Sequence, residues 1–181
     1  MSEPVQVRFA GFGGQGIVLA GALLGKSASL FDDREAVFTQ SYGPEARGGA
    51  SRADVIIADE PVDYPYVTEP DILVVMFQEA WMKFGTGLGT GATLLVEKEL
   101  VDPQGSPVDP VVVPAVDLAE QLGSRIVANV VMLGGVVGAT GVVRREAVEA
   151  AIRDTVKPAL IDLNLRALAA GIDAVGAECA A

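Results

Sequence analysis

The segment that decides the fold spans residues 5–28 and reads VQVRFAGFGGQGIVLAGALLGKSA. Its first part, Val5 to Phe9, is an apolar run that predicts a strand. Residues 10–16 follow as a glycine-rich turn. From residue 17 to 28, apolar side chains recur at helical spacing, and the small residues among them permit close packing. The segment therefore predicts a strand, a glycine turn and a helix in direct succession.

The rest of the chain continues this alternation. A loop over residues 43–49 is too short for a helical crossover, which takes about a dozen residues, so the strands that flank it should be antiparallel. The pattern predicts an α/β protein, a Rossmann-like open, mostly parallel sheet with one antiparallel hairpin and C-terminal helices. We expect a single domain over residues 1–181, with a loose tail over 171–181. The further strands are expected at residues 36–42, 50–58, 72–76, 93–97 and 111–113, and the further helices at 78–84, 117–122, 126–138, 144–154 and 160–170.

The composition excludes several classes of site. The chain has no His and only one Cys, Cys179, which excludes imidazole zinc sites, catalytic triads that need a histidine, internal disulfides and iron–sulfur clusters. A net charge of −11 argues against nucleic acid and against a polybasic membrane anchor. The N-terminus has no signal-peptide pattern, so we expect a cytoplasmic protein without a metal ion.

The glycine turn is the first candidate binding site. It matches G-x-G-x-x-G between a strand and a helix, where glycines let a ligand approach the backbone and the helix N-terminus attracts an anion. Alternatively, the glycines only permit tight packing of the helix on the strand. A NAD site would need an acid at the end of the second strand, which instead ends in Gln40-Ser41-Tyr42. Asp32 and Asp33 precede that strand, at the other edge of the sheet, where we expect Asp32 to be solvated. The candidate residues in the turn are Gly11, Gly13, Gly14, Gln15 and Gly16.

A second glycine-rich loop provides the other candidate residues. We expect strand 36–42 to lie beside the first strand, so that both loops meet at the carboxyl edge of the sheet, where open α/β sheets bind ligands. Arg47 would bring a forked cation suited to phosphate or carboxylate. Alternatively, Arg47 forms an exposed pair with Glu45. Arg52 is expected to have a structural role, paired with Asp54 or another acid. The candidates here are Ser41, Tyr42, Glu45, Arg47, Gly48 and Gly49.

The apolar run over residues 126–143 is long enough to be considered as a membrane-spanning helix. Its glycines favour a broken helix instead, and we expect a buried helix packed closely against a partner subunit. Asn129 would cap this helix or form a hydrogen bond within the interface. Gln78, directly after a strand, is either a ligand donor or a helix cap.

Two long motifs carry a resemblance to a known family. Residues 10–17 (AGFGGQGI) and 40–51 (QSYGPEARGGAS) resemble the gamma subunit of 2-oxoacid:ferredoxin oxidoreductases. Residues 70–73 (PDIL), 78–80 (QEA) and 129–134 (NVVMLG) fit the same family, so the resemblance covers about residues 5–170. The residue sequence of the second motif is similar to that of the 2-oxoglutarate type.

The resemblance implies a reaction in which a 2-oxoacid is decarboxylated on thiamine diphosphate, electrons pass through iron–sulfur clusters to ferredoxin, and the acyl group is transferred to coenzyme A. It implies alpha, beta and ferredoxin-like subunits that hold the thiamine diphosphate and the clusters. This chain would then help to form the coenzyme A site and the wall of the active site. The alternatives are a non-catalytic assembly subunit and a stand-alone nucleotide-binding oxidoreductase.

Overall fold

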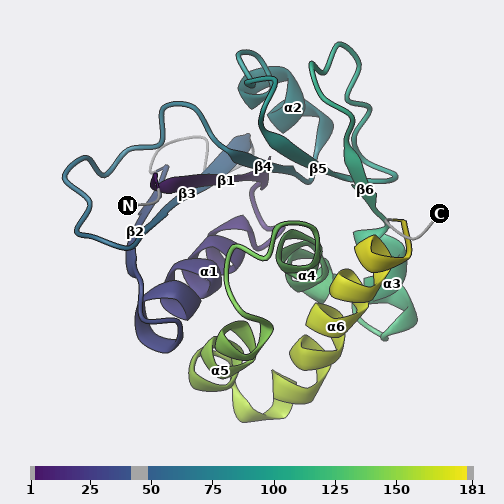
Figure 1. Ribbon diagram of the computed structural model, residues 1–181. Helices are drawn as coiled ribbons and strands as arrows, with labels where there is room; N and C mark the ends of the chain where they lie inside the picture. The colour runs from purple at the N-terminus through teal and green to yellow at the C-terminus, as the bar shows by residue number, and fades with distance from the viewer. Residues whose placement is uncertain (1–2, 42–48, 179–181) are drawn as a thin grey trace.

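The computed structural model describes residues 3–41 and 49–178, which form one sheet with helices on both faces (Figure 1). The strands are β1 (Val5–Phe12), β2 (Glu35–Gln40), β3 (Ala50–Ala58), β4 (Ile72–Val75), β5 (Thr93–Glu97) and β6 (Val111–Val113). The helices are α1 (Ile17–Phe31), α2 (Gln78–Phe84), α3 (Ala115–Gln121), α4 (Ala128–Thr140), α5 (Arg145–Thr155) and α6 (Ile161–Glu178), with short 3-10 turns at Arg125–Val127 and Pro158–Leu160.

The six strands of the described residues follow the order β2-β3-β1-β4-β5-β6. The pairs β1–β4, β4–β5 and β5–β6 are parallel, whereas β2–β3 and β3–β1 are antiparallel. Helix α2 covers one face of the sheet, and the other helices cover the opposite face (Figure 1). This arrangement confirms the predicted α/β class and the antiparallel hairpin.

The position of the hairpin corrects one expectation. Strand β3, and not β2, lies beside β1, and β2 forms the edge of the sheet. All but one of the residues of β3 are buried, whereas every residue of β2 is at least partly exposed. The more apolar strand therefore takes the interior position, because burial on both faces stabilises apolar side chains.

Helix α4 has its companion within the chain, which corrects the expectation that it packs against a partner subunit. It lies against α6 (Figure 1), and the two backbones approach closely at glycines. A Cβ on Gly134 would overlap the carbonyl oxygen of Leu168, and a Cβ on Gly171 would overlap that of Val131. Small residues on both helices therefore permit the contact that buries the apolar run.

Helix α6 extends beyond residue 170, where the sequence pattern placed its end. It continues to Glu178, and Val175 in this last part is 3% exposed. A Cβ on Gly138 of α4 would lie 2.5 Å from the Val175 side chain, so this part of α6 packs against α4. None of the helices within the described ranges has the length and hydropathy to span a membrane.

Asp32, expected to be solvated, is largely buried. Its side chain is 8% exposed and accepts a hydrogen bond from the guanidinium of Arg144, at the start of α5. This hydrogen bond and the carboxylate charge raise the pKa of Arg144 above its ordinary value. The expectation was wrong because sequence does not show that α5 folds back against the end of α1.

Candidate functional site

The glycine turn lies where β1 gives way to α1, at the carboxyl edge of the sheet. The N–H of Gln15 donates to the carbonyl oxygen of Phe12 at 3.1 Å, which closes the turn. Gly14 and Gly16 have φ angles of 96° and 76°. Only glycine adopts this region at low cost, so these two glycines are required by the backbone itself.

The side chain of Gln15 bridges two strands. Its Oε1 accepts from the N–H of Phe12 at 2.6 Å, and its Nε2 donates to the carbonyl oxygen of Met76 at 3.0 Å. The chain leaves β1 and β4 toward opposite faces of the sheet, and at such a point an open α/β fold usually binds its ligand between the strands. Here the chain's own glutamine spans that crevice. A dinucleotide held in the usual Rossmann manner would have to displace it.

Asn129 fixes the turn from the far end of the sequence. It is 2% exposed, and its Nδ2 donates to the carbonyl oxygen of Gly16 at 3.0 Å. A Cβ on Gly16 would lie 2.8 Å from Cγ of Asn129, so glycine is needed here for space as well as for φ. The hydrogen-bonding role expected for Asn129 is thus met within the chain, at the glycine turn rather than in a subunit interface.

The first turn of α1 presents amide groups to a shallow hollow. No side chain within the described residues caps the helix, and its first described backbone bond runs from the N–H of Ala20 to the carbonyl oxygen of Gly16. Uncapped N–H groups and the positive end of the helix dipole favour an anion. Val18 and Leu19 beside them are 39% and 37% exposed, so the wall is apolar. The hollow has a volume of about 510 Å³ and is lined by Phe12, Gly13, Gly14, Gly16, Ile17, Val18, Leu19, Ala22 and Ser51.

The second loop returns to the sheet next to this turn. Ala50 pairs with Phe12, and Ser51 pairs with Gly11. The segment that follows Gly49 therefore lies directly beside the glycine turn, as expected for loops that share one edge. Tyr42, Glu45, Arg47 and Gly48 lie outside the described residues.

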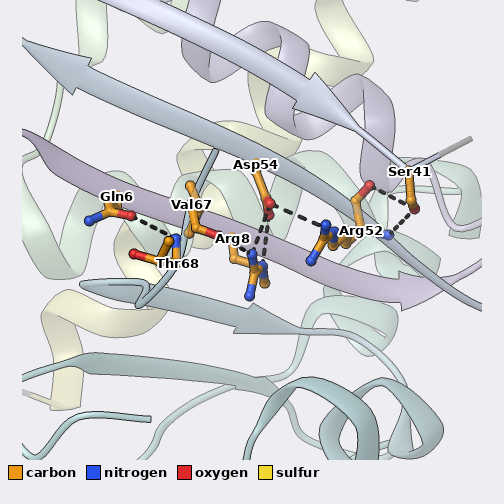
Figure 2. Close-up of polar contacts among 7 residues, drawn as sticks. All are labelled: Gln6, Arg8, Ser41, Arg52, Asp54, Val67 and Thr68. Carbon is orange, nitrogen blue, oxygen red and sulfur yellow. Dashed lines mark hydrogen bonds and ion pairs between the residues drawn. The ribbon is translucent and has the colours of Figure 1, made fainter. Parts of the chain in front are cut away.

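Ser41, at the other end of the loop, closes the hairpin. Its N–H donates to the carbonyl oxygen of Arg52 at 3.2 Å, and its Oγ accepts from the N–H of Arg52 at 3.3 Å. Its hydroxyl is thus engaged with backbone in the described structure (Figure 2).

A buried ion pair lies on the face of the sheet opposite α1. Nε and Nη2 of Arg8 donate to the two carboxylate oxygens of Asp54 at 2.8 and 2.9 Å (Figure 2). Nε of Arg52 lies 3.7 Å from the same carboxylate, which confirms the expected pairing of Arg52 with Asp54. Composition and spacing gave no sign that Arg8 would be its main partner, because the two residues meet across neighbouring strands.

Gln78 forms two hydrogen bonds with the backbone of Asp102, at 2.7 and 3.1 Å. It joins the start of α2 to the loop after β5, a role that neither of its expected interpretations covers. Among the described residues, no group of three or more histidine, cysteine, aspartate or glutamate side chains is placed to hold a metal ion.

Comparison with known proteins gives the family. The model of the pyruvate ferredoxin/flavodoxin oxidoreductase family matches residues 6–174, nearly the whole chain. The chain belongs to this family. It is homologous to the gamma subunit of 2-oxoglutarate synthase: the subunit KorC of Methanocaldococcus jannaschii is 46% identical over 172 residues, which cover 93% of this chain and 92% of that one.

Solved structures agree with this family assignment. The gamma subunit of a keto/oxoacid ferredoxin oxidoreductase from Geobacter sulfurreducens has a TM-score of 0.89 and 39% identity, covering 97% of this chain and 98% of that one. The 2-oxoglutarate:ferredoxin oxidoreductase of Magnetococcus marinus, with 2-oxoglutarate, coenzyme A and succinyl-CoA bound, has a TM-score of 0.84. The two chains are 19% identical over 98% of this chain and 32% of that one, and this likeness shows a shared fold.

Proposed function

We propose that this oxidoreductase-family chain is the gamma subunit of a 2-oxoglutarate:ferredoxin oxidoreductase, which forms an acyl-coenzyme A and CO₂ with reduction of ferredoxin, or runs the reverse reaction. The observation that carries the proposal is the 46% identity to a 2-oxoglutarate synthase subunit over nearly the full length of both chains. We place the iron–sulfur clusters on partner subunits, because a single cysteine supplies too few thiolates for a cluster. Thiamine diphosphate is placed there as well, as the family resemblance implies.

Within that enzyme, we assign the glycine turn and the loop beside it to the wall of the coenzyme A site. Coenzyme A combines phosphate groups with a long, largely apolar arm. Uncapped amides at the start of α1 fit the anionic part, and the exposed side chains of Val18 and Leu19 fit the apolar part. Arg47, in the adjoining loop, would add a forked cation for a phosphate.

A subunit with no ligand of its own is the second candidate. The same exposed side chains favour it, because apolar groups around an open hollow also suit a contact with another protein. The bridge formed by Gln15 argues against the stand-alone nucleotide-binding oxidoreductase, since this chain's own side chain spans the usual dinucleotide crevice.

The test begins with the chain purified with its natural partners. Polypeptides rich in cysteine and a thiamine-diphosphate-binding polypeptide should co-purify, and the complex should reduce ferredoxin with 2-oxoglutarate and coenzyme A. The chain alone should be inactive. Turnover by the pure chain would refute the subunit assignment, and a preference for another 2-oxoacid would refute the substrate.

The variant Gly13→Val then distinguishes a subunit that forms a wall of the coenzyme A site from a subunit that has no ligand of its own. A wall of the coenzyme A site predicts a raised KM for coenzyme A in an assembled complex. A pure assembly subunit predicts loss of the complex, with KM unchanged in the fraction that survives.

A further inference from the structure

The segment over residues 59–70, which we call the strap, joins β3 to β4 at the end of the sheet away from the glycine turn (Figure 1). The register shows this separation: Val5 pairs with Ile57 at one end of the β1–β3 ladder, and Phe12 pairs with Ala50 at the other. Pro61, Pro65 and Pro70 lie in the strap. Each fixes one φ angle and so reduces the conformational freedom of this irregular segment.

Polar side chains of β1 and β3 hold the strap against the sheet. Nη2 of Arg8 donates to the carbonyl oxygen of Val67 at 2.8 Å while the same guanidinium pairs with Asp54 (Figure 2). Arg8 is 7% exposed and Asp54 4%. The N–H of Thr68 donates to Oε1 of Gln6 at 3.0 Å. The strap is thus ordered before any partner arrives, which lowers the entropic cost of binding.

The strap exposes two aromatic side chains that form a pair. Tyr64 and Tyr66 are 61% and 57% exposed, and their rings meet edge to face with centroids 5.5 Å apart. Tyrosine is enriched in protein interfaces because it offers a large, rigid contact surface and a polar end. A prearranged, exposed pair therefore points to an interaction surface.

A hollow of about 530 Å³ adjoins the tyrosines, and its lining combines apolar side chains with carboxylates. Glu3, Glu60 and Asp63 line it, are exposed, and make no ion pair with a described residue, whereas Asp59 is paired with Arg34. Of the described residues that line the hollow, none is a lysine or an arginine. An apolar occupant would strip water from these carboxylates without compensation, so the surface favours a cationic one.

We propose that the strap and its hollow dock a basic segment of another subunit, one that places an arginine or lysine between the tyrosines and the carboxylates. A guanidinium or ammonium group binds favourably over a tyrosine face, and Glu60 and Asp63 balance its charge. The net charge of −11 would also steer a basic surface toward this chain. This docking surface rests on the proposed function, because it needs an enzyme of several subunits.

The experiment uses the complete complex, with a fluorescent label on this chain, and follows its dissociation on dilution at about 0.15 M salt, where exposed charges are screened beyond ~8 Å. One variant carries Glu60→Gln with Asp63→Asn, and a second carries Tyr64→Ala with Tyr66→Ala. The matched control carries Glu79→Gln with Asp109→Asn, which removes the same charge at exposed positions away from the strap.

Each strap variant should raise the dissociation constant at least about tenfold, and the control less than about twofold. A photo-cross-linker in place of Tyr64 should attach to a basic segment of another subunit. All substituted side chains are exposed, and an unchanged melting temperature of each variant verifies its fold.

Strap variants that dissociate like the control would overturn the docking surface, as would cross-links to a second copy of this chain or to an acidic segment. In either case, a complex that still turns over 2-oxoglutarate leaves the proposed function standing. A chain that purifies with no other subunit would refute the proposed function, and the docking surface with it.

Discussion

Replacing Gly171 by alanine should destabilise the protein, although alanine is the better helix former. Gly171 lies in α6 where this helix crosses α4. An added Cβ would overlap the carbonyl oxygen of Val131 and lie 2.9 Å from the amide nitrogen of Gly135. Both atoms belong to the backbone of α4, so neither can turn aside as a side chain would. The two helices have to separate to make room for the methyl group.

The expected magnitude combines two opposing effects. Overpacking in a well-packed core typically costs about 1–3 kcal/mol, occasionally more. The higher helix propensity of alanine offsets about 0.8–1.0 kcal/mol of this. Because backbone meets backbone here, we expect the upper part of the range and a net loss of about 2 kcal/mol. For a protein of this size, that corresponds to a melting temperature lower by about 4–8 °C.

Gly176→Ala is a matched control in the same helix. A Cβ at this position meets no described atom within 4 Å, so we expect only the propensity effect. Its free energy of unfolding should rise by up to about 1 kcal/mol. Urea unfolding of the purified chain, followed by circular dichroism, measures both variants against the parent. Equal stabilisation by the two substitutions would refute the close contact of α4 with α6.

Three further substitutions test the carboxyl edge of the sheet. Asn129→Ala removes the donor to Gly16, whose carbonyl oxygen keeps the bond from Ala20, and should lower the free energy of unfolding by about 0.5–1.5 kcal/mol. Urea unfolding measures this, and a change below about 0.5 kcal/mol would show that the turn does not need this donor. Gln15→Glu places a carboxylate oxygen against the carbonyl oxygen of Met76 and should lower the free energy of unfolding at neutral pH by about 1–3 kcal/mol. A variant as stable as the parent protein from pH 5 to 8 would contradict the bridge. Arg47→Ala should raise KM for coenzyme A about ten- to a hundredfold in a complex that elutes intact on gel filtration, with partial recovery in Arg47→Lys; a nearly silent change, below about 1 kcal/mol, would instead indicate a surface pair with Glu45.

Much of the fold could be predicted because its signals are local. The glycine turn, the helix over residues 78–84 and the strand over 50–58 follow from short runs of residues, and the structure places them there. The antiparallel hairpin followed from loop length. Which of its two strands lies next to β1 depends on burial across the whole sheet, and a single loop carries no signal for that.

The contacts of the candidate site were harder to foresee, since they join distant segments. Asn129 contacts Gly16 across 113 positions of sequence, and Arg8 reaches Asp54 across 46. For Gln15, the motif alone predicted a ligand contact, and the structure shows bonds to its own backbone. The binding roles of the two glycine-rich loops stay a prediction until a bound complex is measured.

The β1–β3 ladder determines how the two halves of the proposed coenzyme A site are spaced. Its register runs from Val5 with Ile57 to Phe12 with Ala50, so backbone hydrogen bonds join the end of one motif to the end of the other. The glycine turn and the start of β3 should therefore move as one rigid unit. No hinge separates these two described segments, so a ligand that contacts both would meet a fixed spacing between them. Exchange of backbone amide hydrogens would show this as uniformly slow exchange along the ladder, unchanged when coenzyme A is added.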